Sequence, residues 1–371
     1  MRKVKIGIVG IGNVGSHVLY TLALQGLADE FVLIDINEKK AAADRQDTFD
    51  SAMFLPHKVK ITVAHVAELI EKHLAENAAG DSVEKGSLDA GQAGESEERN
   101  AVGTSADGPA DAAGIPEDIG DFALLKDCDI IINSVGQIDL LRTGHDRFTE
   151  LKFNIPAVRS YARFIAASGF DGILINISNP CDVITHELIR LIPLPKGHIF
   201  GTGTGLDTAR LRAALADRLQ ISVDSITAYM FGEHGSHQIT PWSIASYNGV
   251  PLDVMEDLDP RFSFDRDAAE HAAAEGGWVT YNGKFHTEFA ISLTASRIVK
   301  AIIYDEHAVL PASCLLEGQY GEQDVCAGVP AVIGAGGAEL IPELPITKEE
   351  RARFHECCDV IRGNIARAAE L

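Results

Sequence analysis

The segment Gly10-Ile11-Gly12-Asn13-Val14-Gly15 restricts the possible folds more than any other feature of the sequence, because of what surrounds it. It follows the apolar run VKIGIVG and opens a stretch of helical apolar spacing. A second apolar run, FVLID, a helical stretch over residues 38–54 and a third run, VKITV, come next. This alternation predicts βαβ units around a parallel sheet. The runs lack polar alternation, which predicts that both faces of the sheet are covered.

The alternation resumes later in the chain and changes character near residue 180. CDIIINSVG predicts a strand, residues 147–168 a long helix, and GILINIS a strand that ends at Asn179-Pro180. Beyond it we expect helices over 206–219, 265–274 and 287–304, short strands in SITAYMFG and ITPWSIASYNG, and a closing helix over 347–371. Thr347 and Glu350 form a capping box for that helix. We predict an α/β protein, with a Rossmann-type doubly wound parallel sheet over residues 1–180 and a mixed α+β domain over 181–371.

Residues 75–118 interrupt this pattern. They are rich in Ala, Gly, Ser, Asp and Glu and contain almost no large apolar residue. Such a segment cannot bury enough surface to offset its ordering entropy. We therefore predict an acidic, disordered or loosely packed insertion. A solvated loop is the favoured interpretation, and a partner-binding or regulatory segment is the alternative.

The composition excludes several classes of function. Acidic residues number 54 against 32 basic ones, and the formal net charge of −22 disfavours nucleic acid and anionic membranes as partners. No apolar run is long enough to span a bilayer, and the N-terminus lacks a cleavage-like site, so we expect a cytoplasmic protein. The six cysteines show no CxxC spacing, which predicts neither a disulfide framework nor a metal site. Because the net charge is negative, a site that binds an anionic substrate would need arginines next to it.

The glycine motif predicts a dinucleotide site, because each residue has a task in that context. Gly10 permits the tight turn, Gly12 lets the backbone approach a pyrophosphate, and Gly15 lets helix and strand pack closely. Amide groups at the helix N-terminus would face the phosphates. Asp35 ends the second strand and can accept hydrogen bonds from a ribose. Its charge would repel a 2′-phosphate, so we predict NAD rather than NADP.

Two motifs in the second domain predict acid–base chemistry on a carboxylic acid. Asp207-Thr-Ala-Arg210 opens a predicted helix, and Gly232-Glu-His234-Gly follows a predicted strand. Hydride transfer from a 2-hydroxyacid needs a group that takes the hydroxyl proton, and it needs cations for the carbonyl and the carboxylate. Taken singly, Asp207 could be a helix cap and His234 a turn residue.

The segments GTGTGLDTARLR, MFGEHGSH and INISNPCDVI together resemble the L-lactate/malate dehydrogenase family. The resemblance covers nearly the whole chain outside the acidic insertion. DRFTELKF and GTGTGLDTAR are most similar to the L-2-hydroxyisocaproate dehydrogenase branch. The resemblance implies an NAD-dependent L-2-hydroxyacid dehydrogenase that acts on a small 2-oxo or 2-hydroxy acid. It also implies a homodimer or homotetramer.

The resemblance assigns roles residue by residue. His234 would be the general acid and base, Asp207 would orient its ring, and Arg147 would polarise the substrate carbonyl. Arg210 would grip the carboxylate with its two-pronged guanidinium, which a lysine cannot copy. The remaining predicted contacts are Asn179, Thr287 and Leu141 for the substrate, and Gly10, Gly12, Asn13, Val14, Gly15, Asp35, Gly136 and Asn179 for the cofactor.

The expected substrate depends on the loop before Arg147. Malate-type enzymes have an arginine six positions before the polarising arginine, where this chain has Leu141 next to Leu140. An apolar residue there favours an apolar substrate side chain, as in a 2-oxoisocaproate-like acid or pyruvate, because it leaves a second carboxylate unpaired.

Two alternative functions remain open, and one form of regulation is disfavoured. With the loop register shifted by one residue, Arg142 becomes the malate-type arginine and the chain a malate dehydrogenase. A catalytically silent NAD-binding scaffold, whose insertion recruits a partner, is a third possibility. Thr227 stands where sugar-phosphate-activated relatives have a histidine, which argues against activation by fructose bisphosphate.

Overall fold

The computed structural model describes residues 3–73, 75, 116–136 and 147–371, and for 147 and 148 only the backbone. The predicted insertion over 75–118 thus lies almost entirely outside the described residues. The strands are β1 (Lys5–Val9), β2 (Glu30–Ile34), β3 (Lys60–Val63), β4 (Ile130–Asn133), β5 (Ile173–Asn176), β6 (Ile199–Gly201), β7 (Ile226–Thr227), β8 (Phe231–Gly232), β9 (Gln238–Ile239), β10 (Ser246–Tyr247), β11 (Val250–Pro251), β12 (Ala308–Glu317), β13 (Gln323–Gly334) and β14 (Gly337–Leu340).

One large sheet organises the molecule, in the order β3-β2-β1-β4-β5-β6-β12-β13-β8-β9, with β14 also on β13. The first six strands are parallel, with Ile6 between Phe31 and Ile130 in the register. The change of direction between β1 and β4 is the switch point of a doubly wound sheet. The predicted Rossmann-type fold class is therefore confirmed.

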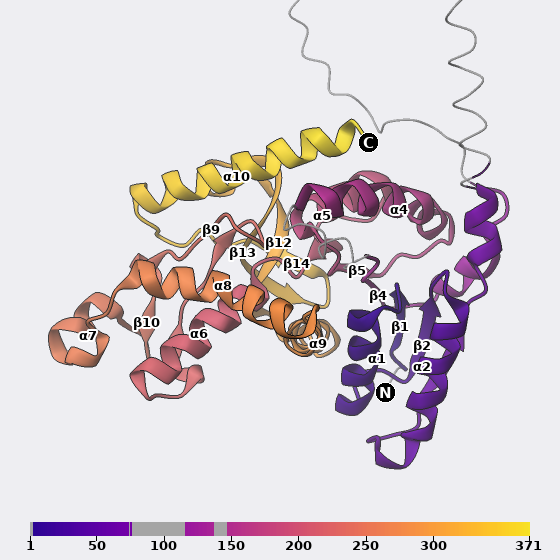
Figure 1. The fold of residues 1–371 in the computed structure, drawn as a ribbon, viewed down its shortest axis with the longest axis horizontal. Coiled ribbons are helices and arrows are strands. Elements are labelled where there is room, and N and C mark those ends of the chain that lie inside the picture. Colours follow the sequence, from indigo (N-terminus) through magenta and orange to yellow (C-terminus); the bar gives the residue numbers. More distant parts are fainter. Residues whose placement is uncertain (1–2, 74, 76–115, 137–146) are drawn as a thin grey trace, which may run out of the picture.

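Helices cover both faces of the parallel strands. The helices of the described residues, in both lobes, are α1 (Asn13–Gln25), α2 (Glu38–Asp50), α4 (Arg147–Ala167), α5 (Cys181–Leu191), α6 (Gly205–Leu219), α7 (Leu252–Leu258), α8 (Arg266–Lys284), α9 (Phe289–Ile303) and α10 (Lys348–Ala369). In Figure 1, α4 and α5 lie on one side of the strands and α1 on the other, while α10 runs along the top of both lobes. α9 packs against α1, and α6 against α8.

The hydrophobic core is continuous across the two lobes. Strand residues such as Ile8, Ile132 and Ile175 share one cluster with Val329 and Phe354 of the second lobe. A smaller cluster lies under α6, α7 and the three-stranded sheet β11-β10-β7. The parallel order extends through β6, which follows the predicted boundary near residue 180 in sequence. That boundary stays a prediction, with the two lobes joined through β6 and β12.

Three elements differ from the sequence analysis. The helix expected over 38–54 ends at Asp50 and continues as a short 3-10 turn over 52–54. The helix expected to end at residue 274 continues through Gly276-Gly277 to Lys284. The antiparallel hairpin of β12 and β13 was not predicted, and it carries the sheet from the first lobe into the second. The capping box of α10 is present as predicted.

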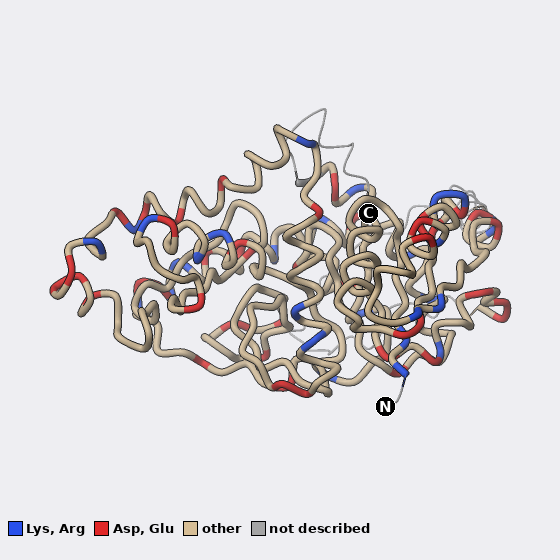
Figure 2. Tube along the Cα trace, turned by 90° about the horizontal axis from the view of Figure 1, so that it is seen from below, with Lys and Arg blue, Asp and Glu red and all other residues tan. Residues whose placement is uncertain are grey.

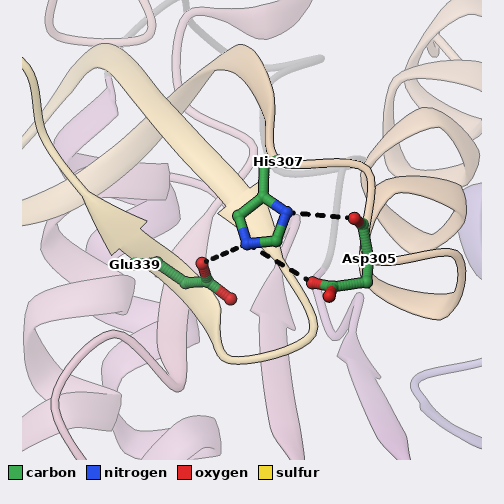
Figure 3. Close-up of side chains that lie close together, drawn as sticks. All are labelled: Asp305, His307 and Glu339. Carbon is green, nitrogen blue, oxygen red and sulfur yellow. Dashed lines mark hydrogen bonds and ion pairs between the residues drawn. The ribbon is translucent and has the colours of Figure 1, made fainter.

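Polar contacts hold the end of this hairpin at which β12 begins and β13 ends. Asp305, after α9, accepts the N–H of Ala335 at 2.8 Å, and Glu339 of β14 accepts the N–H of Gly336 at 2.8 Å. His307 lies between the two carboxylates, with Nε2 at 3.2 Å from Glu339 and 3.6 Å from Asp305 (Figure 3). The three side chains thereby fix the β13–β14 turn against the chain that enters β12.

Candidate active site

His234 and Asp207 meet as the sequence predicts. Asp207 lies in the first turn of α6, and its Oδ2 is 2.6 Å from Nδ1 of His234, which follows β8. Asp207 is 2% exposed and His234 16%. A buried carboxylate on Nδ1 holds the proton at that nitrogen and leaves Nε2 for exchange with a bound molecule. The pair can therefore transfer a proton into a cavity.

Arg210 completes this group from the next turn of α6. Its Nη1 donates to Oδ1 of Asp207 at 3.1 Å, so one carboxylate contacts both cationic side chains. The arginine packs across α8, where a Cβ on Gly277 would lie 3.2 Å from Nη1 and one on Gly276 would lie 3.3 Å from Cδ. The contact with Arg210 gives a reason for two glycines inside α8. They make room for the guanidinium beside the helix.

These residues line a cavity of about 160 Å³ between the lobes. The cavity wall combines the polar group with apolar side chains from α1, β5, α8 and α9. Its lining residues include Val14, Ile177, Asn179, Asp207, Arg210, His234, Trp278, Tyr281, Thr287 and Ile291. Val14, Asn179, Arg210 and Thr287 were predicted from the sequence. Trp278 and Tyr281 were not, because α8 was expected to end before them.

Asn179 lines this cavity three residues after the end of β5, and its peptide bond to Pro180 is cis. Its main-chain oxygen accepts a hydrogen bond from Nδ2 of Asn154 on α4 at 2.5 Å. The side-chain oxygens of Asn179 and Asn154 are buried and have no hydrogen-bond partner among the described residues. Buried polar atoms normally have a partner, so the side-chain oxygen of Asn179, which lines the cavity, is available to a bound molecule. Asn154 was missed because nothing near it in the sequence marks it.

The glycine motif forms the predicted loop between β1 and α1. Gly10 has φ +93°, and a Cβ on Gly15 would lie 2.1 Å from the Gly10 oxygen. Space is open over Gly12, where a Cβ would meet nothing within 4 Å, and no side chain caps the helix that starts at Asn13. Open space beside uncapped amides fits a pyrophosphate. Gly136, also predicted, is exposed near this loop after β4.

Asp35 has a second task besides the predicted one. Its Oδ2 accepts the N–H of Ile11 at 2.5 Å, and its Oδ1 accepts the N–H of Asn37 at 2.7 Å. The carboxylate therefore braces the glycine loop from the end of β2. Each oxygen keeps a second lone pair, so the residue can still accept a ribose hydroxyl.

The polarising arginine and the substrate-specificity loop were also predicted from the sequence. Arg147 is the first residue of α4, and its side chain lies outside the described residues. Leu140, Leu141 and Arg142 lie there as well. Their predicted roles stay predictions.

The comparisons with known proteins agree with this geometry. Residues 4–80 match the lactate/malate dehydrogenase, NAD binding domain, and residues 204–371 match the lactate/malate dehydrogenase, alpha/beta C-terminal domain. An L-lactate dehydrogenase from Fusobacterium nucleatum is 36% identical over 97% of this chain and 96% of its own length. This chain belongs to the lactate/malate dehydrogenase family. The predicted family is confirmed, and so is its class, an NAD-dependent oxidoreductase.

Other family members support the same assignment. L-lactate dehydrogenase 3 from Bacillus cereus is 32% identical over 96% of both chains. The ligand-bound structure of a minor L-lactate dehydrogenase from Enterococcus mundtii has a TM-score of 0.78 and 28% identity over 98% of both chains. A lactate dehydrogenase from a deep-sea metagenome has a TM-score of 0.80 and 26% identity over the full length of both.

Within the described residues, no helix is long and apolar enough to cross a membrane. The predictions of a cytoplasmic location, of a homo-oligomer and of a site without metal stay predictions.

Proposed function

We propose that this dehydrogenase reduces a 2-oxo acid with an apolar side chain, pyruvate or a 2-oxoisocaproate-like acid, with NADH as the hydride donor. The observation that carries the proposal is the single buried carboxylate of Asp207, which contacts both a histidine and an arginine at one cavity wall. A proton donor and a carboxylate-binding cation are thereby held side by side. A 2-oxo acid carries a carbonyl and a carboxylate on adjacent carbons, which suits a proton donor and a cation on the same cavity wall.

The residues of this chain would act as follows. Arg210 binds the substrate carboxylate with two parallel hydrogen bonds. His234 donates a proton from Nε2 to the carbonyl oxygen, and Asp207 stabilises the imidazolium before the transfer. The glycine loop would hold NADH, which would supply the hydride. Arg147, at the start of α4, would polarise the carbonyl. Because reduction consumes the imidazolium proton, its rate should fall as the pH rises, and the reverse oxidation should rise.

The cavity wall supports the apolar substrate. Thr287 and Ile291 line it from the start of α9, and Trp278 and Tyr281 from α8. Trp278 and Tyr281 present large, mostly apolar rings, and such a wall rewards burial of alkyl groups. The curated relatives named above are L-lactate dehydrogenases, which places pyruvate first among the small candidates.

A substrate panel tests the proposal. Pyruvate, 2-oxoisocaproate and oxaloacetate are each supplied with NADH, and kcat and KM are measured from the loss of NADH absorbance. We expect kcat/KM to be at least about tenfold higher for one of the first two than for oxaloacetate, because the extra carboxylate would be buried without a partner. Oxaloacetate as the best substrate would instead identify a malate dehydrogenase that uses Arg142.

His234→Ala is the control for the panel. We expect this variant to lose at least about 100-fold in kcat while it still binds NADH, since only the proton donor is removed. NADH oxidation at the wild-type rate in this variant would contradict the proposed role of His234.

A further inference from the structure

Asp182 is a fully buried carboxylate directly behind the catalytic histidine. It lies in the first turn of α5 and is 1% exposed. Its Oδ2 accepts the main-chain N–H of His234 at 2.9 Å, and its Oδ1 accepts the hydroxyl of Ser313 in β12 at 2.6 Å. Three elements distant in sequence are thus joined at the residue that exchanges the proton.

The fold alone does not require a charge at this position. Glu187, on the same helix, is also buried, but Arg159 donates to it at 2.6 Å and Arg190 at 2.9 Å. Burial raises the pKa of Glu187, and the hydrogen bonds from the two arginines more than offset this, so that its pKa lies below the usual value. Asp182 has no lysine or arginine partner in the described part of the chain. An asparagine could accept the same N–H without a buried charge.

We propose that Asp182 is a positioning residue for His234, which holds the main chain of the histidine in place and favours the protonated ring with its charge. Two carboxylates then act on one histidine, Asp207 on its side chain and Asp182 behind its backbone. The inference rests on the proposed role of His234 as the proton donor. It gives a task to a residue of the segment INISNPCDVI to which the family resemblance assigned no role.

Few titratable groups share this environment. They are Glu233 and His234 after β8, Cys181 in α5, Cys314 in β12, Cys326 in β13 and Cys358 in α10. Burial raises the pKa of Cys181 and of Cys314 to about 12, so these thiols stay neutral at working pH. Glu233 is itself engaged by His237 at 2.8 Å. His234 itself faces Asp207 and Arg210 of α6 and shares its cavity with the buried Glu150 of α4, all of which keep their places when Asp182 is replaced.

The ionisation of Asp182 has opposite effects on activity and stability. Burial raises its pKa to about 6, against the opposing effect of the Ser313 and His234 hydrogen bonds. A carboxyl group whose pKa is higher in the folded than in the unfolded chain destabilises the fold as the pH rises through that interval. At pH 7.5 the charge is present and costs stability. Asp182→Asn should therefore keep or raise the melting temperature while it impairs catalysis.

The test compares Asp182→Asn and Asp182→Ala with the wild type, using the faster of pyruvate and 2-oxoisocaproate. We expect kcat at pH 7.5 to fall roughly tenfold in the first variant and roughly 100-fold in the second, because small misplacements of a catalytic group are costly. The pH at which the reduction rate falls should move down by roughly 0.5 unit in Asp182→Asn. The kinetic isotope effect with deuterated NADH should rise, and KM for NADH should stay within about twofold.

Glu187→Gln is the matched control, a buried carboxylate on the same helix outside the catalytic group. It should lower the melting temperature, because it breaks two ion pairs, and leave the pH profile and the isotope effect unchanged. Wild-type kcat and pH profile in Asp182→Asn would overturn the inference. A loss of activity in Asp182→Ala that is proportional to the loss of folded protein would also overturn it.

His234→Ala separates the two proposals. If it abolishes reduction while both Asp182 variants behave as the wild type, only the positioning role fails. If it leaves reduction intact, both proposals fail.

Discussion

Asp207 shows how much one side chain can do when it is buried between a histidine and an arginine. Its two oxygens contact His234 and Arg210, so it orients the ring and the guanidinium at once. In a site that excludes water, both contacts are stronger than they would be on the surface. The relative position of the proton donor and the carboxylate-binding group is therefore set by one rigid carboxylate in the first turn of α6.

The geometry of Arg210 leads to a first residue-scale prediction. In Arg210→Lys the ammonium group cannot form two parallel hydrogen bonds with the substrate carboxylate. The lysine side chain is also too short to fill the space of the arginine. We expect KM for the 2-oxo acid to rise about 30-fold, about 2 kcal/mol of lost binding. KM for NADH should change little, since the glycine loop is separate.

Arg212→Lys is the control on the same helix. Arg212 donates from Nε to the main-chain oxygen of Ala228 and lies over the ring of Tyr229, away from the cavity lining. Its KM values should match those of the wild type. An equal rise of KM in both variants would show that the effect comes from general charge and not from the carboxylate contact.

Some of the site residues could be predicted from the sequence, and others are visible only in the structure. His234, Asp207 and Arg210 were predicted because the sequence segments that contain them resemble the motifs of the family. Asn154 and Asp182 were not, since their task depends on backbone groups that only the fold brings near. A lone asparagine or aspartate in a helical stretch has no signature of that task.

At the scale of elements, α10 illustrates a helix whose start is determined by its N-cap residue. Thr347 accepts the N–H of Glu350 at 3.1 Å, and Glu350 accepts the N–H of Thr347 at 2.8 Å. The other oxygen of Glu350 accepts the N–H of Ser243 at 2.9 Å. One carboxylate therefore both caps the helix and attaches the chain after β9, while Phe354 and Ile361 fill the core below.

The cap gives an element-scale prediction. Thr347→Ala should lower the free energy of unfolding by about 1 kcal/mol, measured by urea denaturation, with kcat unchanged, because it removes the acceptor for one helix amide. Thr347→Ser keeps the hydroxyl and should lie within about 0.5 kcal/mol of the wild type. Equal stability of the alanine and wild-type proteins would mean that water replaces the cap.

The helix α8 shows the opposite case, in which local rules mislead. Gly276-Gly277 predicts an end, because glycine is a poor helix former. The helix continues through them, and the guanidinium of Arg210 packs where their side chains would be. Contacts across the α6–α8 interface outweigh the local preference.

At the scale of the whole molecule, charge is the dominant property. Acidic residues occur along the chain trace in both lobes (Figure 2). With a net charge of −22, mutual repulsion opposes the compact state. The Debye length falls from about 30 Å at 0.01 M salt to about 10 Å at 0.1 M, which screens most of that repulsion.

Salt should therefore stabilise the protein. Raising NaCl from about 10 to about 150 mM at pH 7.5 should increase the melting temperature by several degrees in differential scanning fluorimetry, because the long-range repulsion is screened. The same series close to the isoelectric point, about 4.9, should show little change. A melting temperature that falls with salt at pH 7.5 would mean that attractive ion pairs outweigh the net charge.

The sequence by itself predicted the parallel sheet and the cofactor loop, and its resemblance to the family pointed to His234 as the proton-transfer group. The sheet and the loop depend on periodicity or on residues close together in the chain, where local sterics and hydrogen bonding decide. Only the tertiary structure decided that β12 and β13 join the lobes into one sheet, that α8 admits the guanidinium of Arg210, and that Asp182 lies behind His234. These depend on packing between distant segments, and no local pattern records which surfaces will meet.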